Sequence, residues 1–413
     1  MSVTVPQPAI DLEKIRAQFP ALHQTVHGKP LIYLDNAATT QKPQAVLDAM
    51  ADYYRYDNAN VHRSVHDLAE RATTALEATR QQLQQWIHAS DPAEIIFTSG
   101  TTASINLVAS TYGRQTIQAG DEIIISHMEH HANIVPWQML CQAKGATLKV
   151  IPISETGELC LGEFEKLLTP KTKIVAITYA SNTLGTINPI QQITQLAHAQ
   201  GAVVVVDAAQ ALPHFPIDVQ ELDCDFLAFS AHKAYGPTGV GALYGKRALL
   251  EAMPPYQGGG EMIRQVTLTH TTYNDIPYKF EAGTPHIAGI IAWQKALNFI
   301  QEIGYENLRS HENKLLIYVT DLLGDLERIQ LIGTAPDKVG VLSFTIEGMH
   351  HLDATMLLDA QGIAVRAGHS CTQPLMDLLG IEGTIRVSLA VYNTEEEMTQ
   401  LAAAIERIIQ KNT

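Results

Sequence analysis

The chain has 413 residues, of which 46% are hydrophobic, and a formal net charge of −15 at pH 7. This length exceeds what one hydrophobic core usually organises, and the apolar content is too high for general disorder, so we expect two folded domains. The negative charge argues against nucleic acid and anionic membranes as partners, because both require a basic surface.

The N-terminal sequence and the cysteine spacing indicate the kind of compartment in which the protein works. The N-terminus shows no basic segment followed by an apolar one, and no apolar run approaches the roughly 20 residues that span a bilayer. The cysteines form no C-x-x-C pair and suggest no disulfide framework; they are Cys141, Cys160, Cys224 and Cys371. These features predict a protein of a reducing compartment, either the cytoplasm or an organelle stroma with the import signal absent, with no metal site.

From Leu31 onward, apolar segments of strand length alternate with helical patterns. Short Ile- and Val-rich runs separated by helices indicate a mostly parallel sheet that is covered on both faces. Ligands of such folds bind beyond the carboxyl ends of the strands. The expected strands are 94–98, 122–126, 174–179, 203–206 and 225–229, and the expected helices are 11–18, 101–112, 133–144 and 190–200.

A longer helix is expected at 287–303, because Ile290, Trp293, Leu297 and Ile300 fall on one of its faces. This helix leads to a second region, for which the pattern predicts strands at 340–346 and 384–389 and a C-terminal helix at 394–410. The predicted organisation is a large domain of residues 25–300 and a small domain formed by residues 1–24 and 301–413.

Two of the expected strands end on residues that can together bind an aldehyde cofactor. Asp207 follows the strand at 203–206, and Lys233 follows the strand at 225–229 after a short loop of small residues. A lysine can bind an aldehyde as a Schiff base, and a carboxylate can hold a protonated ring nitrogen, as pyridoxal phosphate (PLP) requires. Gln210 can point toward the phenolate oxygen of the ring or be an ordinary turn residue. A lone lysine is more often a surface residue, and the pairing with Asp207 favours the cofactor.

The segment 97–102 reads as a strand, a glycine turn and the start of a helix. The backbone N–H groups and dipole of a helix start form an anion site, to which Thr101 and Thr102 add hydroxyls. A plain helix N-cap explains a threonine there equally well. Ser230 and His232 precede Lys233 and can complete a site for the phosphate of the cofactor.

Residues 127–133 are rich in histidine but lack the H-E-x-x-H spacing of a zinc-binding helix, so a metal site is the weaker interpretation. A histidine stacked on a pyridine ring, or one that moves protons at neutral pH, is the better one.

Cys371 lies in a loop between Gly368 and Pro374, which permits the loop to move. Free cysteines are usually buried small hydrophobic residues, which suits the apolar surroundings of Cys141 and Cys224 but not this loop. The nearby Arg366 and His369 favour a thiolate.

Arg386 lies in a strand pattern, where its charge must have a partner. A substrate carboxylate bound bidentately and a structural salt bridge are both possible partners, and the sequence leaves the two open.

Together these motifs resemble the cysteine desulfurases of the class V aminotransferase-like PLP family, most closely the SUF-type (group II) branch, in which the cysteine loop is short. The likeness extends in order from about residue 11 to the C-terminal helix. The matching stretches are 34–40 (LDNAATT), 60–63 (NVHR), 98–102 (TSGTT), 129–133 (EHHAN), 206–210 (VDAAQ), 230–233 (SAHK), 280–285 (FEAGTP) and 366–371 (RAGHSC).

The resemblance implies the α/β fold of PLP-dependent aminotransferases of fold type I, with a large domain around a mostly parallel sheet and a smaller α+β domain. It also implies the roles of the cofactor-binding residues. Lys233 binds the cofactor and shuttles the Cα proton, Asp207 pairs with the ring nitrogen, Gln210 with the phenolic oxygen, His130 stacks on the ring, and Thr101, Thr102, Ser230 and His232 bind phosphate.

The resemblance further implies that Cys371 takes sulfur from L-cysteine as a persulfide and releases L-alanine, feeding iron–sulfur cluster assembly through a SufE-like acceptor. Asn182 and Arg386 are expected to hold the substrate carboxylate, with Arg366 nearby. Thr284 is expected to reach the phosphate of a neighbouring subunit, which implies a homodimer.

Ser370, Thr372 and Ala231 depart from the commonest family motif, in which histidine, alanine and glycine respectively are frequent. The first two departures can alter proton supply around the thiol. The alternatives are a selenocysteine lyase or cystine C–S lyase on the same fold, a class V aminotransferase, and a non-catalytic carrier of sulfur; L-selenocysteine is therefore a second possible substrate.

Overall fold

The computed structural model describes residues 10–411. Its larger sheet has seven strands in the order β4-β10-β9-β8-β7-β5-β6. Strand β10 runs antiparallel to both of its neighbours, and the pairs from β9 to β6 are parallel, so the prediction of a mostly parallel sheet is confirmed. The strands are β4 (Ile95–Thr98), β5 (Glu122–Ser126), β6 (Thr147–Ile151), β7 (Thr172–Thr178), β8 (Val203–Asp207), β9 (Phe226–Ser230) and β10 (Gly241–Gly245).

Helices cover both faces of this sheet, which explains its continuous apolar strands. Within β8, Val204 and Val206 enter one core cluster and Val205 enters another, because successive side chains of a strand point to opposite faces. The first cluster includes α2 (Gln44–Asp52), α3 (Asp67–Trp86), α8 (Ile190–Ala199) and α11 (Ile287–Ile303), and the second includes α4 (Thr101–Val108), α6 (Val135–Lys144) and α10 (Arg247–Ala252).

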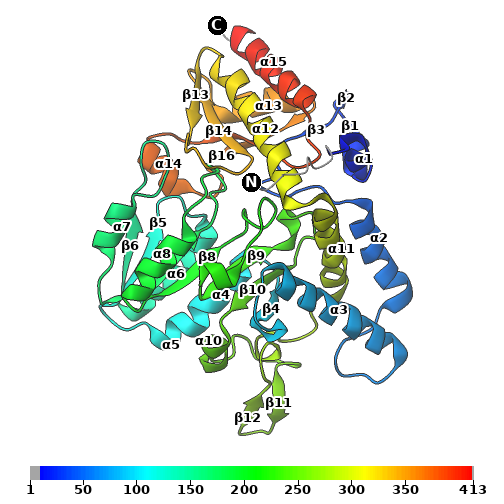
Figure 1. Cartoon of the computed structure of the whole chain (residues 1–413), viewed down its shortest axis with the longest axis vertical. Coiled ribbons are helices and arrows are strands. Elements are labelled where there is room, and N and C mark those ends of the chain that lie inside the picture. The colour runs from blue at the N-terminus through cyan, green and yellow to red at the C-terminus, as the bar shows by residue number, and fades with distance from the viewer. Residues whose placement is uncertain (1–9, 412–413) are drawn as a thin grey trace, which may run out of the picture.

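A smaller antiparallel sheet lies at the other end of the molecule (Figure 1). Its core is a third cluster, in which Leu342 and Phe344 pack against residues of three helices, such as Leu315, Leu358 and Ile405. The strands, in sheet order, are β13 (Ile329–Ile332), β14 (Val341–Ile346), β17 (Thr384–Ser388) and β16 (Arg366–Gly368), and the helices are α12 (Tyr305–Gly324), α13 (His351–Asp359) and α15 (Glu395–Lys411).

Strand β3 (Ile32–Tyr33) joins the N-terminal segment to the smaller sheet region by pairing in parallel with β15 (Ile363–Ala364). Ile32 and Leu34 are buried in the third cluster. The predicted domain boundary at residue 25 therefore stays a prediction, and the pairing favours a boundary after Leu34. Residues 1–9 and 412–413 of the predicted small domain lie outside the described residues.

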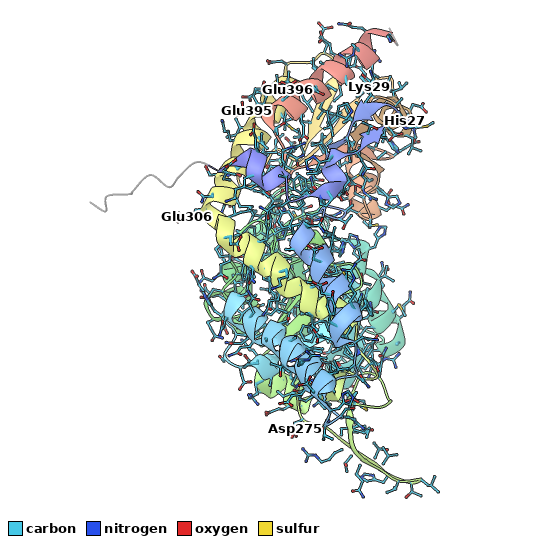
Figure 2. The ribbon with its side chains drawn as sticks, turned by 90° about the vertical axis from the view of Figure 1, so that its right-hand side faces the viewer. His27, Lys29, Asp275, Glu306, Glu395 and Glu396 are labelled. Atoms are coloured by element: carbon cyan, nitrogen blue, oxygen red, sulfur yellow. The ribbon has the colours of Figure 1, made fainter. Side chains whose placement is uncertain are left out.

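A hairpin of β11 (Ile263–Val266) and β12 (Thr271–Tyr273) projects from the body of the molecule near Asp275 (Figure 2). Among residues 10–411, no helix has the length and apolarity needed to cross a bilayer. The remaining helices and strands are α1 (Leu12–Arg16), α5 (Arg114–Thr116), α7 (Leu161–Leu167), α9 (Val219–Leu222), α14 (Gln373–Leu379), β1 (Thr25–Val26) and β2 (Lys29–Pro30).

The predicted elements occur at the expected places, with ends shifted by a few residues. The helix expected at 101–112 is α4 followed by a π-helical turn over Ala109–Gly113. Among the elements that the sequence patterns did not predict are α2, α3, α12, β6 and β10.

Candidate functional site

A cavity of about 430 Å³ opens at the edge of the large sheet where β8 and β9 end. Polar groups that follow different strands meet here, because parallel strands place their carboxyl ends at the same edge. Every predicted site residue except Thr284 lines the cavity: Thr101, Thr102, His130, Asn182, Asp207, Gln210, Ser230, His232, Lys233, Arg366, Cys371 and Arg386.

Lys233 and Asp207 are brought together by the register of β8 and β9. Asp207 ends β8 opposite Ala228 of β9, and Lys233 lies in the single 3-10 turn that follows β9. The Asp207 carboxylate is buried and accepts a hydrogen bond from the Ala209 N–H at 3.0 Å. Burial raises the pKa of Asp207 and lowers the pKa of Lys233 to about 8. A cationic ring nitrogen beside Asp207 would supply the partner that this carboxylate needs.

The opposite end of the cavity is suited to a phosphate. The Ser230 hydroxyl accepts a hydrogen bond from the Thr101 N–H at 2.8 Å and lies 2.7 Å from the Thr101 hydroxyl. His232 Nδ1 is buried and has no hydrogen-bond partner among the described residues. Gly100 has φ +145°, and a Cβ there would lie 3.3 Å from Ser230 Oγ. The unpartnered imidazole nitrogen and the clustered hydroxyls fit a bound anion.

Gln210 lines the cavity, whereas Thr284 does not. Gln210 Nε2 donates to the Ala37 carbonyl at 2.7 Å, so one amide proton is used within the protein while the side chain lines the cavity. Thr284 is exposed and outside this cavity.

His130 is neutral in this site. Its Nδ1 accepts a hydrogen bond from the Ala132 N–H at 3.0 Å, which assigns the ring proton to Nε2. Burial, with the Lys233 cation adding to it, lowers the pKa of His130 to about 3. The preceding residue, Glu129, has no role in the sequence analysis. It is fully buried, and it accepts hydrogen bonds from Ser126 Oγ at 2.6 Å and Asn133 Nδ2 at 2.7 Å, which fixes the His130 segment.

Cys371 is exposed on a loop between β16 and α14 that neighbouring segments hold in place. Asn182 Nδ2 donates to the Ser370 carbonyl at 2.7 Å, and the His131 N–H donates to the Cys371 carbonyl at 2.8 Å. Ser370 and Cys371 have φ values of 48° and 59°, in the left-handed region that L-residues rarely occupy. The hydrogen bonds thus stabilise an unusual backbone that presents the thiol to the cavity.

Thr372, which stands where alanine is common in the family motif, also helps to hold the cysteine loop in place. Its hydroxyl lies 2.9 Å from that of Thr183, and both residues are buried. His369 Nδ1 accepts a hydrogen bond from the Cys371 N–H at 3.1 Å, so the ring caps the turn.

Arg386 has a structural partner and an unused donor. Its guanidinium lies 3.0 Å from Asp35 Oδ1 and donates to the Asn182 carbonyl at 2.9 Å. Arg386 Nε is buried without a partner among the described residues. Arg366 binds Asp35 as well, with Nε 3.0 Å from Oδ1 and one terminal nitrogen 2.9 Å from Oδ2. Asp35 belongs to the matched stretch 34–40, but nothing in its sequence context signals that it joins two arginines.

Within residues 10–411, no three His, Cys, Asp or Glu side chains are placed to hold a metal ion.

The sequence and the fold of the chain both match those of known proteins. The family model for class-V aminotransferases matches residues 32–401. A probable cysteine desulfurase of Vibrio cholerae is 50% identical over 400 residues, which cover 97% of this chain and 99% of that protein. The crystal structure of the cysteine desulfurase CsdA from Escherichia coli superposes with a TM-score of 0.91 at 41% identity, covering 98% of this chain and 99% of that one.

A cysteine desulfurase of Synechococcus elongatus is also 50% identical, over 398 residues that cover 96% of this chain. The chain spans 64% of that protein's length, which is less than two thirds.

Proposed function

Because the chain belongs to the class-V aminotransferase family and, within it, to the PLP-dependent cysteine desulfurases, we propose that it removes sulfur from L-cysteine as a persulfide on Cys371. The observation that carries this proposal is that the Cys371 thiol and the Lys233 amine line one cavity. An aminotransferase needs the amine but has no evident use for an exposed thiol beside it.

PLP, when bound, supplies an acceptor for the electrons released when the Cα–H bond of the substrate breaks. Lys233 would hold the cofactor covalently, and its amine would serve as the base for the Cα proton. Asp207 would pair with the ring nitrogen, His130 would cover the ring, and Gln210 would face the phenolic oxygen. The hydroxyls of Thr101, Thr102 and Ser230 and the His232 side chain would bind the phosphate.

The substrate carboxylate binds at Arg386, whose Nε lacks a partner among the described residues, with Asn182 lining the same cavity. This placement directs the substrate side chain toward the loop of Cys371. The Cys371 thiolate forms an S–S bond to the substrate sulfur while the Cβ–S bond breaks, and the electron pair of that bond stays with carbon. Cβ then takes a proton, and L-alanine leaves.

A Cys371→Ala variant tests the proposal. We expect it to retain the visible absorption of the lysine-bound cofactor and to lose alanine formation from L-cysteine, because no thiol is left to take the sulfur. Cys160→Ala, which removes another partly exposed cysteine outside the cavity, is the control and should keep full activity. In the unmodified protein, mass spectrometry of the Cys371 peptide should show one added sulfur atom.

Normal sulfide release from L-cysteine by Cys371→Ala would exclude the proposed role of the thiol. Cleavage of L-selenocysteine that survives the same substitution would instead identify selenocysteine lyase activity, which does not need that thiol.

We also propose that the protein is a homodimer. Thr284 is exposed and lies outside the cavity of its own chain, so it is free to reach the phosphate site of a second copy. The projecting hairpin exposes Leu268 fully and Val266 by 59%, and apolar side chains on an extended hairpin are typical of a contact surface.

The persulfide is passed to a SufE-like acceptor that feeds iron–sulfur cluster assembly in the cytoplasm. A groove of about 520 Å³ beside the cysteine loop supports a docking site, with His369, Gln373 and Glu382 among its lining residues. Nearby, α13 and α14 expose apolar side chains, which we call the α13–α14 surface: Leu352, Met356, Leu357, Leu378 and Leu379.

A further inference from the structure

Asp35 forms ion pairs with two arginines of the site, Arg366 and Arg386, and does not itself line the cavity. Its carboxylate accepts a two-point ion pair from Arg366 and a further hydrogen bond from Arg386. Arg366, Arg386 and Cys371 line the cavity, whereas Asp35 does not. One carboxylate therefore offsets part of the positive charge of two guanidinium groups that share the cavity with the thiol.

The two arginines differ in how firmly they are held. The Arg386 side chain is 2% exposed and is also bonded to the Asn182 carbonyl, so it is fixed in the protein. The Arg366 side chain is 44% exposed, and Asp35 is the partner of its Nε and of one terminal nitrogen. The Nε edge of Arg366 is therefore used on Asp35, and this ion pair sets the orientation from which the remaining N–H groups of Arg366 can act on other groups of the cavity.

We propose that Asp35 is a positioning residue that retains Arg366 in the resting enzyme and limits how strongly this cation attracts the Cys371 sulfur. The inference rests on the role given to Cys371 above. Loss of the Asp35 charge would free Arg366 and leave the cavity more positive, and both changes favour the thiolate over the thiol.

Other charged groups also act on this sulfur, so the effect of Asp35 must be separated from theirs. His369 Nδ1 accepts a hydrogen bond from the Cys371 N–H, and the His131 N–H donates to the Cys371 carbonyl. The other titratable and charged groups that line the cavity are His130, Asp207, His232, Lys233, Arg366 and Arg386.

The test measures alkylation of Cys371 by iodoacetamide, followed by peptide mass spectrometry, in the cofactor-loaded and the cofactor-free protein. Asp35→Asn should alkylate about tenfold faster than the unmodified protein at pH 7, the change expected when one nearby charge is lost. The control is Asp275→Asn, which breaks an exposed ion pair with Arg264 near the distant hairpin and should not change the rate.

A double-mutant cycle assigns the effect to Arg366. In an Arg366→Gln background, Asp35→Asn should accelerate alkylation by a smaller factor than in the unmodified background, because the cation that Asp35 retains is absent and only the loss of the Asp35 charge beside Arg386 remains. An equal acceleration in both backgrounds, or none in either, would overturn the proposal. If Asp35→Asn does not fold, Asp35→Glu keeps the charge but displaces it, and a rate equal to that of the unmodified protein at every pH would also overturn it.

This readout is independent of the proposed reaction. Alkylation depends on the thiolate fraction and accessibility of Cys371 and does not require turnover, so an inactive enzyme with the expected rates would contradict the desulfurase role of Cys371 and leave the inference about Asp35 intact.

Discussion

At Lys233, burial rather than a nearby cation is the main influence on protonation. Removal from water disfavours the ammonium form, while the Asp207 carboxylate opposes the effect. The balance leaves the amine neutral in a large fraction of molecules at mildly alkaline pH. A neutral amine is the form that can attack an aldehyde.

The rate at which the cofactor-free protein takes up PLP should therefore rise with pH and level off above about 8, the pKa to which Lys233 is lowered. An ordinary lysine would give a rate that keeps rising to about 10.5. The growth of the visible absorption band after PLP is added, measured across this pH range, checks the expectation. A midpoint near 10.5 would show that Lys233 is well hydrated in the cofactor-free protein.

Residues such as Lys233, Asp207 and Cys371 were predictable because each departs from its local pattern: two follow buried strands, and one is a cysteine in a polar loop. The role of Asp35 was not predictable, because it depends on arginines 331 and 351 positions away. Glu129 was missed for a different reason: its partners Ser126 and Asn133 are close in sequence, but a glutamate in a histidine-rich segment reads as a surface residue until its burial is known.

At the level of elements, apolar side chains are exposed on α13 and on α14, the helix that follows the cysteine loop. Met356 is 70% exposed on α13, and Leu378 is 50% exposed on α14. Such an α13–α14 surface is suited to a protein that must bring its own thiol to Cys371.

Met356→Glu should weaken binding of a SufE-like acceptor about tenfold, corresponding to about 1.4 kcal/mol, because the charge would have to be desolvated at the contact. Persulfide formation in the absence of the acceptor should not change. The control is Ile317→Glu, since Ile317 is 63% exposed on α12, outside this surface. Equal affinity of the two variants, measured by titration calorimetry, would place the acceptor elsewhere.

Strands with repeated Ile or Val and helices with a clear apolar face were identifiable in the sequence. Strand β10, whose residues are Gly241–Gly245, was not, because its two glycines and its antiparallel direction break the pattern of alternating strands and helices. Helix α3 is polar over much of its length and buries only part of one face, so its 20 residues give a weak apolar signal.

For the whole molecule, the fold was predictable from the alternation of elements, whereas the boundary between its two parts stays a prediction. The segment before α2 pairs with β15, which follows it by about 330 residues, and short local patterns do not encode such pairing. The projecting hairpin likewise gives no sign in the sequence of whether its apolar residues are buried by a second copy.

Leu268→Asp should shift the protein from dimer to monomer in sedimentation velocity, because a charge would replace an apolar contact. Cofactor retention should fall with it if Thr284 completes the phosphate site of the second copy. Ile317→Asp serves as the control and should stay dimeric. An unchanged sedimentation coefficient for Leu268→Asp at low protein concentration would remove the hairpin from the subunit contact.

The left-handed backbone at Ser370 and Cys371, bonded from Asn182 on one side and His131 on the other, has a consequence for delivery. A carrier group on a long flexible arm can travel to its recipient, whereas these hydrogen bonds hold the backbone of Cys371 in one place. If Cys371 forms the proposed persulfide, the acceptor would therefore take the sulfur at the mouth of the cavity, where the exposed position of Cys371 leaves it accessible.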